Sequence, residues 1–196
     1  MELGPELLIS AYAQGVFPMA DERGVIRWYQ PDPRAVLPLD QLHISQSLRR
    51  LLRRGNFQIR VNGDFEAVMR ACAAPGPGRE ETWISEDLLQ AYVNLHELGF
   101  AHSVEVIAPD GQMVGGLYGV TVRGLFAGES MFSKAPSASK IALVYLVNRL
   151  RQRGYLLLDV QYLTPHLSRM GAIEVSAAHY AKLLQKALTV EARFDG

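Results

Sequence analysis

The sequence predicts a mixed α/β fold, with a sheet flanked by helices, and three observations support this class. Polar capping residues precede several runs whose apolar residues recur with helical spacing. Two strand-like runs flank the turn sequence Pro109-Asp110-Gly111, which favours a hairpin. A continuous apolar run follows the longest predicted helix. The order is therefore helices, a three-strand meander, a long helix and a central strand, rather than a repeated β-α-β wind.

The helices are predicted from their ends. A serine or aspartate before an apolar run can accept a hydrogen bond from a free N–H of the first turn, and a glycine after the run favours its end. The predicted helices begin at Ser45 (ending at Gly55), Asp64, Ser85 (ending at Gly99), Ser137 or Ser139 (ending near Gly154) and Ser176.

Strands are expected between these helices. Residues 103–108 and 112–122 should form the hairpin, and a turn at Arg123-Gly124 should lead into a third strand that starts at Leu125. Residues 155–160 are almost all apolar and do not alternate with polar residues. This pattern is typical of a strand that is buried on both faces.

We expect two parts in the chain: a small N-terminal subdomain of residues 1–33 and a main domain of residues 34–196. The boundary rests on the sequence Trp-Tyr-Gln-Pro-Asp-Pro-Arg at residues 28–34. Each residue before a proline is pushed away from helical backbone angles, so this stretch is predicted to be an extended linker.

The composition excludes several classes of protein. A chain of 196 residues can bury a stable core without disulfides or bound metals. Its content of hydrophobic residues, 48%, is too high for a disordered chain. One cysteine, Cys72, excludes an intramolecular disulfide framework. The sequence starts without a basic segment followed by an apolar one, and no apolar run is long enough to span a bilayer. We therefore expect a cytoplasmic protein without a membrane partner.

The charge is balanced overall but uneven along the chain. The 20 basic and 20 acidic residues cancel, so the total does not indicate a highly basic nucleic-acid binder. Between His43 and Arg60, however, there is no acid. A local basic face can attract a polyanion, although a solvated helix face gives the same pattern. The arginines that would contact a nucleic-acid backbone are Arg49, Arg50, Arg53 and Arg54.

Two acids occupy positions where a charge is costly. Asp159 follows three leucines on the predicted central strand, and a carboxylate buried there must be paired or hydrogen-bonded. Gln161 lies two residues further and shares its face if the strand continues. Glu129 stands beside Gly128 at the end of another predicted strand. A strand that simply leaves the core gives the same pattern, so the residues alone leave both interpretations open.

Other chemistries find less support in the sequence. Ser130 and Ser133 lack the strand-turn-helix elbow of a serine nucleophile. The histidines have no tight spacing with a cysteine or carboxylate, so no metal site is expected. The glycines of residues 115–119 lack the lysine of a phosphate-binding loop, and they indicate a β-bulge or a strand that passes close to a ligand.

Taken together, these motifs resemble the leucyl/phenylalanyl-tRNA–protein transferase family of the bacterial N-end rule pathway. The resemblance extends along nearly the whole chain, and its most specific element is Gly-Glu-Ser-Met-Phe-Ser at residues 128–133. The other matching stretches are AYAQGVFP at 11–18, WYQPDPRAV at 28–36, TWI at 82–84, GGLYGV at 115–120 and DVQ at 159–161.

The resemblance implies a fold and an activity. The fold would be a GNAT-like acyltransferase domain with a mixed, mostly antiparallel sheet, plus the small N-terminal subdomain. The activity would transfer leucine, phenylalanine or, less readily, methionine from aminoacyl-tRNA to the α-amine of a protein that begins with Arg or Lys, which creates an N-degron. No metal or cofactor is implied. We expect a monomer whose partners are the acceptor end of the tRNA and the protein or peptide substrate.

The resemblance also assigns residues. Asp159 and Gln161 match a pair that assists attack by the acceptor amine, and Glu129 matches an acid that binds or orients the acceptor. Met19 stands where the family commonly has a tryptophan, and Leu146 stands where it has a phenylalanine. The pocket for the amino-acid side chain would contain Leu117, Phe126, Leu143, Leu146 and Leu158. The tRNA 3′ end would lie near Tyr12, Met19, Trp83 and Tyr92.

An aminoacyl ester is already activated, so positioning of the amine can supply most of the rate. In our hypothesis, Asp159 holds Gln161, whose side-chain carbonyl accepts a hydrogen bond from the amine. Alternatively, Asp159 orients the amine through electrostatics.

One rival function is a CoA-dependent N-acetyltransferase, but residues 134–139 contain no glycine to hold a pyrophosphate, and Pro136 removes a backbone N–H donor. The other is a non-catalytic RNA-binding module, which explains the arginines but not the acids.

Overall fold

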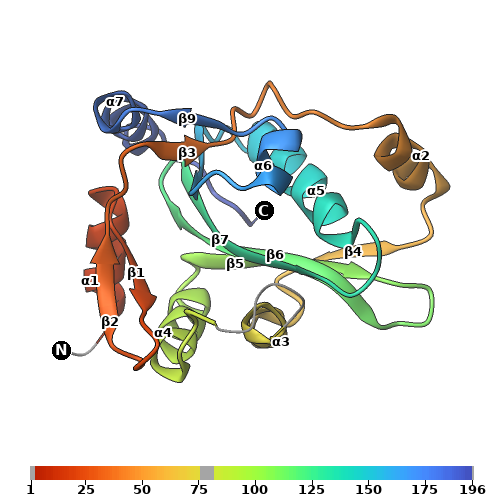
Figure 1. Cartoon of the computed structure of the whole chain (residues 1–196), viewed down its shortest axis with the longest axis horizontal. Helices are drawn as coiled ribbons and strands as arrows, with labels where there is room; N and C mark the ends of the chain where they lie inside the picture. The colour runs from red at the N-terminus through yellow and green to blue at the C-terminus, as the bar shows by residue number, and fades with distance from the viewer. Residues whose placement is uncertain (1–2, 76–81, 196) are drawn as a thin grey trace.

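A seven-stranded sheet forms the centre of the computed structural model, which describes residues 3–75 and 82–195 (Figure 1). The strand order is β4-β5-β6-β7-β8-β3-β9, and all neighbours pair antiparallel except β7 and β8, which are parallel. The strands are β3 (Arg34–Val36), β4 (Gln58–Val61), β5 (Ala101–Ile107), β6 (Met113–Val122), β7 (Leu125–Ser133), β8 (Leu157–Gln161) and β9 (Ile173–Val175).

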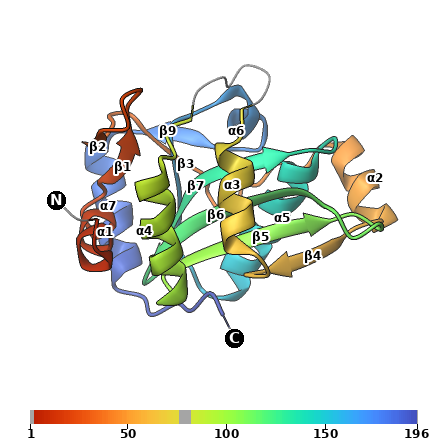
Figure 2. The ribbon, with the colours of Figure 1, turned by 90° about the horizontal axis from the view of Figure 1, so that it is seen from below.

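Helices cover both faces of this sheet, as Figures 1 and 2 show. On one face, α3 (Phe65–Ala73) and α4 (Glu86–Glu97) share a core cluster with α1 (Pro5–Ala13) and α7 (Ala177–Leu188). On the other face lie α5 (Ala138–Gln152), α2 (Gln46–Arg54) and the short α6 (Pro165–Arg169). The predicted class, a mixed and mostly antiparallel sheet flanked by helices, is confirmed.

Most of the predicted helix ends are also confirmed. The side chains of Ser45, Asp64, Ser85 and Ser176 each accept a hydrogen bond from the backbone N–H three residues later. Ser137 precedes α5, but it has a left-handed backbone (φ 66°) and its side chain makes no capping bond. Two helices were not predicted, α1 and α6; both begin at a proline, and α6 has only five residues.

The N-terminal residues form α1 and a separate antiparallel pair, β1 (Phe17–Ala20) and β2 (Ile26–Tyr29). Arg34 then starts β3 inside the main sheet. Leu8, Tyr12 and Phe17 belong to the same core cluster as α4 and β6. The division into residues 1–33 and 34–196 therefore stays a prediction, because no separate core supports it.

Within residues 3–75 and 82–195, no helix has the length and apolar character needed to cross a membrane. In the same residues, no three side chains of His, Cys, Asp or Glu gather where they could hold a metal ion.

Candidate active site

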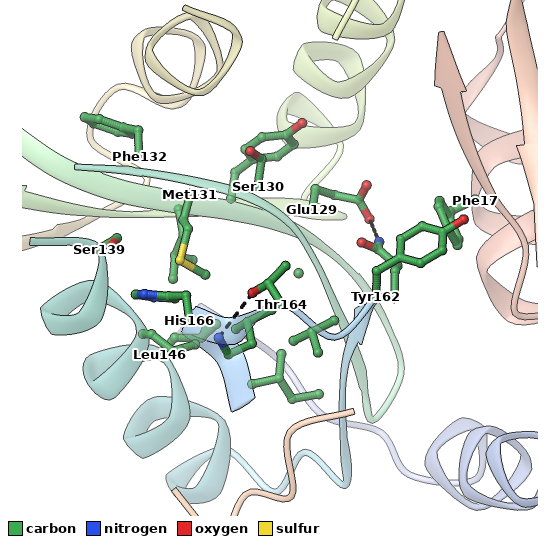
Figure 3. Close-up of a pocket in the computed structure, with 18 of the residues that line it drawn as sticks. Phe17, Glu129, Ser130, Met131, Phe132, Ser139, Leu146, Tyr162, Thr164 and His166 are labelled. Carbon is green, nitrogen blue, oxygen red and sulfur yellow. Dashed lines mark hydrogen bonds between the residues drawn. The ribbon is translucent and has the colours of Figure 1, made fainter. Parts of the chain in front are cut away.

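The site lies where β7 and β8 part. Their parallel pairing runs from Leu125–Leu157 to Ala127–Asp159, after which β8 ends at Gln161 while β7 continues to Ser133. A cavity of about 630 Å³ opens beyond this point, and its lining comes from β6, β7, β8, α5, α6 and the N-terminal residues (Figure 3). A loss of strand pairing thus creates the space that a ligand could fill.

The apolar wall of the cavity contains most of the predicted side-chain pocket. Leu117, Leu143, Leu146 and Leu158 all line it. Phe126 does not, so its assignment to the pocket wall is wrong. Its ring lies over Gly119, where an added Cβ would come within 2.3 Å of Phe126 Cε1, and it packs against Phe194 behind the wall.

Several further residues line the cavity without having been assigned to the side-chain pocket, although Met131 belongs to the 128–133 stretch that carries the resemblance. Phe17, Met131, Val160, Tyr162, Thr164 and His166 also line the cavity. His166 and Ser139 lie at one end of the cavity, and Glu129, Tyr162 and Phe17 lie at the other, as Figure 3 shows. Val160 could have been found from alternation along β8, because it lies two residues after Leu158, which was assigned to the pocket.

Glu129 owes its position to a β-bulge. Gly119 pairs with Gly128, and Tyr118 pairs with Ser130, so Glu129 is an extra residue on β7 without a partner on β6. A bulge re-aims a side chain and is common next to active sites. This finding confirms the bulge that the glycines of residues 115–119 indicated.

Glu129 is buried and meets Gln161. Only 8% of the residue is exposed, and its Oε1 accepts a hydrogen bond of 2.9 Å from Gln161 Nε2. Burial raises the pKa of Glu129 to about 8, and the charge of Asp159 adds to the rise, whereas hydrogen bonds from Tyr12 and Gln161 oppose it. At neutral pH the carboxyl is therefore mostly protonated, and it is not a standing negative charge for a basic acceptor side chain.

The hydroxyls of Tyr12 and Tyr92 lie at the Glu129 carboxyl, and their rings are not placed to stack on a nucleobase. Their hydroxyls lie 2.5 Å apart, and the Tyr92 hydroxyl donates to Glu129 Oε2 at 3.5 Å. The residues are only 2% and 0% exposed, so neither ring has a face free for stacking. Burial raises the pKa of both well above the usual value, which keeps them neutral donors. Of the four residues expected near the tRNA 3′ end, only Met19 and Trp83 line the cavity.

Asp159 lies behind the cavity wall. It is 1% exposed and accepts hydrogen bonds from Arg34 Nε (2.9 Å), Arg34 Nη2 (2.6 Å), the Tyr180 hydroxyl (2.7 Å) and the Gln161 backbone N–H (2.9 Å). The expectation that a carboxylate here must be paired is confirmed. Sequence reasoning missed Arg34, the first residue of β3, and Tyr180, on α7, as its partners.

Gln161 does not share the face of Asp159, as a continuing strand would require. Its φ of 60° is left-handed, and Tyr162 N–H donates to Val160 C=O across it, which makes Gln161 the centre of a γ-turn. Gln161 therefore lines the cavity with Leu158 and Val160. The predicted shared face is wrong because the turn reverses the alternation.

The predicted phosphate-binding arginines lie outside the cavity. Arg49, Arg50, Arg53 and Arg54 are all exposed on α2, which packs on the α5 side of the sheet. Arg49 Nε donates to the Ile44 carbonyl at 3.0 Å. The other three reach solvent from an exposed surface, which is where a nucleic-acid backbone could contact them.

Comparisons with known proteins agree along nearly the whole chain. The family model for leucyl/phenylalanyl-tRNA protein transferase matches residues 36–185, and the model for the N-terminal domain of that family matches residues 1–32. The leucyl/phenylalanyl-tRNA–protein transferase of Rubrobacter xylanophilus is 54% identical over 99% of this chain and 100% of its own length. That of Herpetosiphon aurantiacus is 56% identical over 98% of each chain.

A solved structure is more distantly similar. L-PGS from Bacillus licheniformis has 16% sequence identity and a TM-score of 0.47, over 80% of this chain and 53% of its own. This likeness is too weak to carry an argument about function.

Proposed function

The chain belongs to the leucyl/phenylalanyl-tRNA–protein transferase family, so it is an aminoacyltransferase, and we propose its substrates from this membership and from the site. It transfers leucine or phenylalanine, and less readily methionine, from aminoacyl-tRNA to the α-amine of proteins that begin with Arg or Lys. The product has one new peptide bond and carries an N-degron. We expect it to act in the cytoplasm as a monomer.

The observation that carries this proposal is the pairing of Glu129 and Gln161 at one end of an apolar cavity. An aminoacyl side chain that enters the leucine-lined part would bring its ester carbonyl to this polar end. Because the Gln161 amide nitrogen bonds Glu129, the planar amide directs its carbonyl oxygen away from that carboxyl. That oxygen is then available to accept a hydrogen bond from an incoming amine.

The reaction forms a C–N bond and breaks the ester C–O bond. The neutral amine attacks the carbonyl carbon, one proton leaves the nitrogen, and the tRNA 3′ oxygen gains a proton as it departs. Glutamine is too weak a base to take that proton. Glu129 has a pKa of about 8, close to the range of an α-amine, so its ionised form can accept the proton and return it to the leaving oxygen.

The donor end of the tRNA would approach Met19 and Trp83 at the cavity, while the arginines of α2 would contact its backbone. Trp83 offers a partly exposed ring for stacking of a base. Met19 offers a flexible apolar surface in place of an aromatic one.

The direct test supplies purified protein with leucyl-tRNA and a peptide that begins with arginine. We expect the peptide to gain the mass of one leucine residue. A peptide that begins with methionine serves as the acceptor control, and acetyl-CoA in place of the tRNA tests the acetyltransferase rival. Acetylation without leucylation would contradict the proposal, and tRNA binding without either product would favour the RNA-binding rival.

Variants test the two assigned groups. Gln161→Ala should lower kcat by roughly 10- to 100-fold, as expected for the loss of one positioned polar contact. Glu129→Gln should lower kcat most at and above pH 8, where the parent carboxyl is ionised, because an amide cannot accept the proton. The exposed Gln152→Ala and Glu97→Gln are matched controls. Normal turnover in both site variants would mean that the site is assigned wrongly.

A further inference from the structure

Asp159 is held from two distant parts of the chain. Arg34, at the start of β3, contributes both Nε and Nη2 to it, and Tyr180, on α7, contributes its hydroxyl. A bidentate guanidinium–carboxylate pair fixes direction as well as distance. Since both partners of the ion pair are 1% exposed, this pair is costly to break on one side.

Arg34 is itself fixed in place. Its guanidinium lies 4.7 Å from the ring centre of Phe17 and 4.6 Å from that of Tyr180, so aromatic rings contact it from the N-terminal residues and from α7. Its Nη1 donates to the Gly15 carbonyl at 3.0 Å. A Cβ on Gly15 would lie 2.8 Å from Tyr180 Cε1, so this packing also leaves no space for a larger residue.

The Asp159 carboxylate, fixed in this way, stabilises the backbone turn at Gln161. Asp159 Oδ1 accepts the Gln161 N–H at 2.9 Å, and this is the residue with a φ of 60°. A left-handed backbone at a non-glycine residue costs free energy and persists only where its surroundings determine it. The turn is also what brings the Gln161 amide to Glu129.

We propose that Arg34 and Tyr180 are positioning residues for the transfer reaction, which act through Asp159 on the backbone turn that aims Gln161 at the reacting amine. This inference rests on the proposed function, because it requires Gln161 to contribute to turnover. It also changes the part given to Asp159. With four hydrogen bonds and no place in the cavity lining, Asp159 contacts no substrate and acts only through Gln161.

The test uses Tyr180→Phe, which keeps the ring over Arg34 and removes only the hydroxyl. We expect kcat to fall about tenfold, equivalent to about 1.4 kcal/mol, with the KM values for tRNA and peptide nearly unchanged. Tyr155→Phe is the matched control, because Tyr155 is also buried but precedes β8 at the end away from the site. Arg34→Lys, which cannot form the bidentate pair, should also lower kcat with little change in KM, and its loss of kcat should be larger.

A double-mutant cycle separates positioning from general stability. If Tyr180 acts through Gln161, Tyr180→Phe should cost little further activity in a Gln161→Ala background. An equal fold-loss in both backgrounds would overturn the inference, as would normal kcat in Tyr180→Phe. If Tyr180→Phe does not fold, the same cycle with Arg34→Lys decides. Should Gln161→Ala alone keep normal turnover, the site assignment in the proposed function fails instead.

Discussion

At the scale of single residues, two buried carboxyls in one site have opposite environments. Asp159 meets a guanidinium, which gives it two hydrogen bonds, and two other donors, which together stabilise its charge. Glu129 meets neutral tyrosines and an amide, and burial raises its pKa to about 8. Environments that separate two acids in this way are a recurring means of dividing roles between them.

The raised pKa of Glu129 has a consequence for stability. The neutral form is favoured in the folded state, so the stability that this group contributes is complete below about pH 4.5 and is lost as pH rises through about 8. The Glu129→Gln side chain cannot ionise, so the melting temperature of this variant should fall less between pH 5 and pH 9 than that of the parent chain. Thermal unfolding at both pH values measures this.

The control for this prediction is the exposed Glu97→Gln, which should follow the parent chain at both pH values. If the Glu129→Gln variant showed the same pH dependence as the parent, Glu129 would not be the buried acid that titrates near pH 8.

Residue patterns predicted that Asp159 must be paired, but not with what. Its ion-pair partner is 125 residues away in the sequence, and the tyrosine is on a helix whose apolar face gives no sign of a functional hydroxyl. The orientation of the Gln161 side chain could not be predicted either. Period-two alternation assumes an extended backbone, and the φ of Gln161 is 60°. Long-range partners and backbone exceptions are what local patterns omit.

At the scale of elements, local chemistry predicted most boundaries. Four capping side chains occur where serine or aspartate preceded an apolar run, and the Pro109-Asp110-Gly111 turn separates β5 from β6. The short strands β3 and β9 have three residues each, too few for a periodic signal. Their place in the sheet depends on tertiary packing, and β3 is the strand that brings Arg34 to the site.

Helix α2 carries a prediction of its own. Its four exposed arginines should release counterions when they contact tRNA phosphates, so affinity should fall steeply with salt. Replacing all four with alanine should reduce the slope of log K against log salt by roughly 3, since each phosphate contributes about 0.7 to 0.9. Binding of aminoacyl-tRNA at several salt concentrations measures the slope.

The matched control removes Arg151 and Arg153 near the end of α5, which should change the slope little. Circular dichroism must show that the α2 variant is folded. An unchanged slope in a folded variant would mean that α2 is only a solvated surface.

At the scale of the whole molecule, the site depends on both ends of the chain. The N-terminal residues supply Phe17 and the Gly15 carbonyl to Arg34, and α7 supplies Tyr180 to Asp159. Family resemblance suggested a separate N-terminal subdomain, and the family models do match residues 1–32 and 36–185 separately. Physically, however, the two parts share one core cluster.

A fragment of residues 34–196 tests what that shared core means. The fragment lacks Leu8, Tyr12 and Phe17, each nearly fully buried in the intact chain. Burial of a large apolar side chain contributes about 1.5–3 kcal/mol, so the fragment forgoes roughly 5–9 kcal/mol, comparable with the whole stability of a small protein. We expect no cooperative thermal transition from the fragment alone, and restored folding when residues 1–33 are co-expressed. A fragment that melts cooperatively by itself would instead establish residues 34–196 as an independent domain.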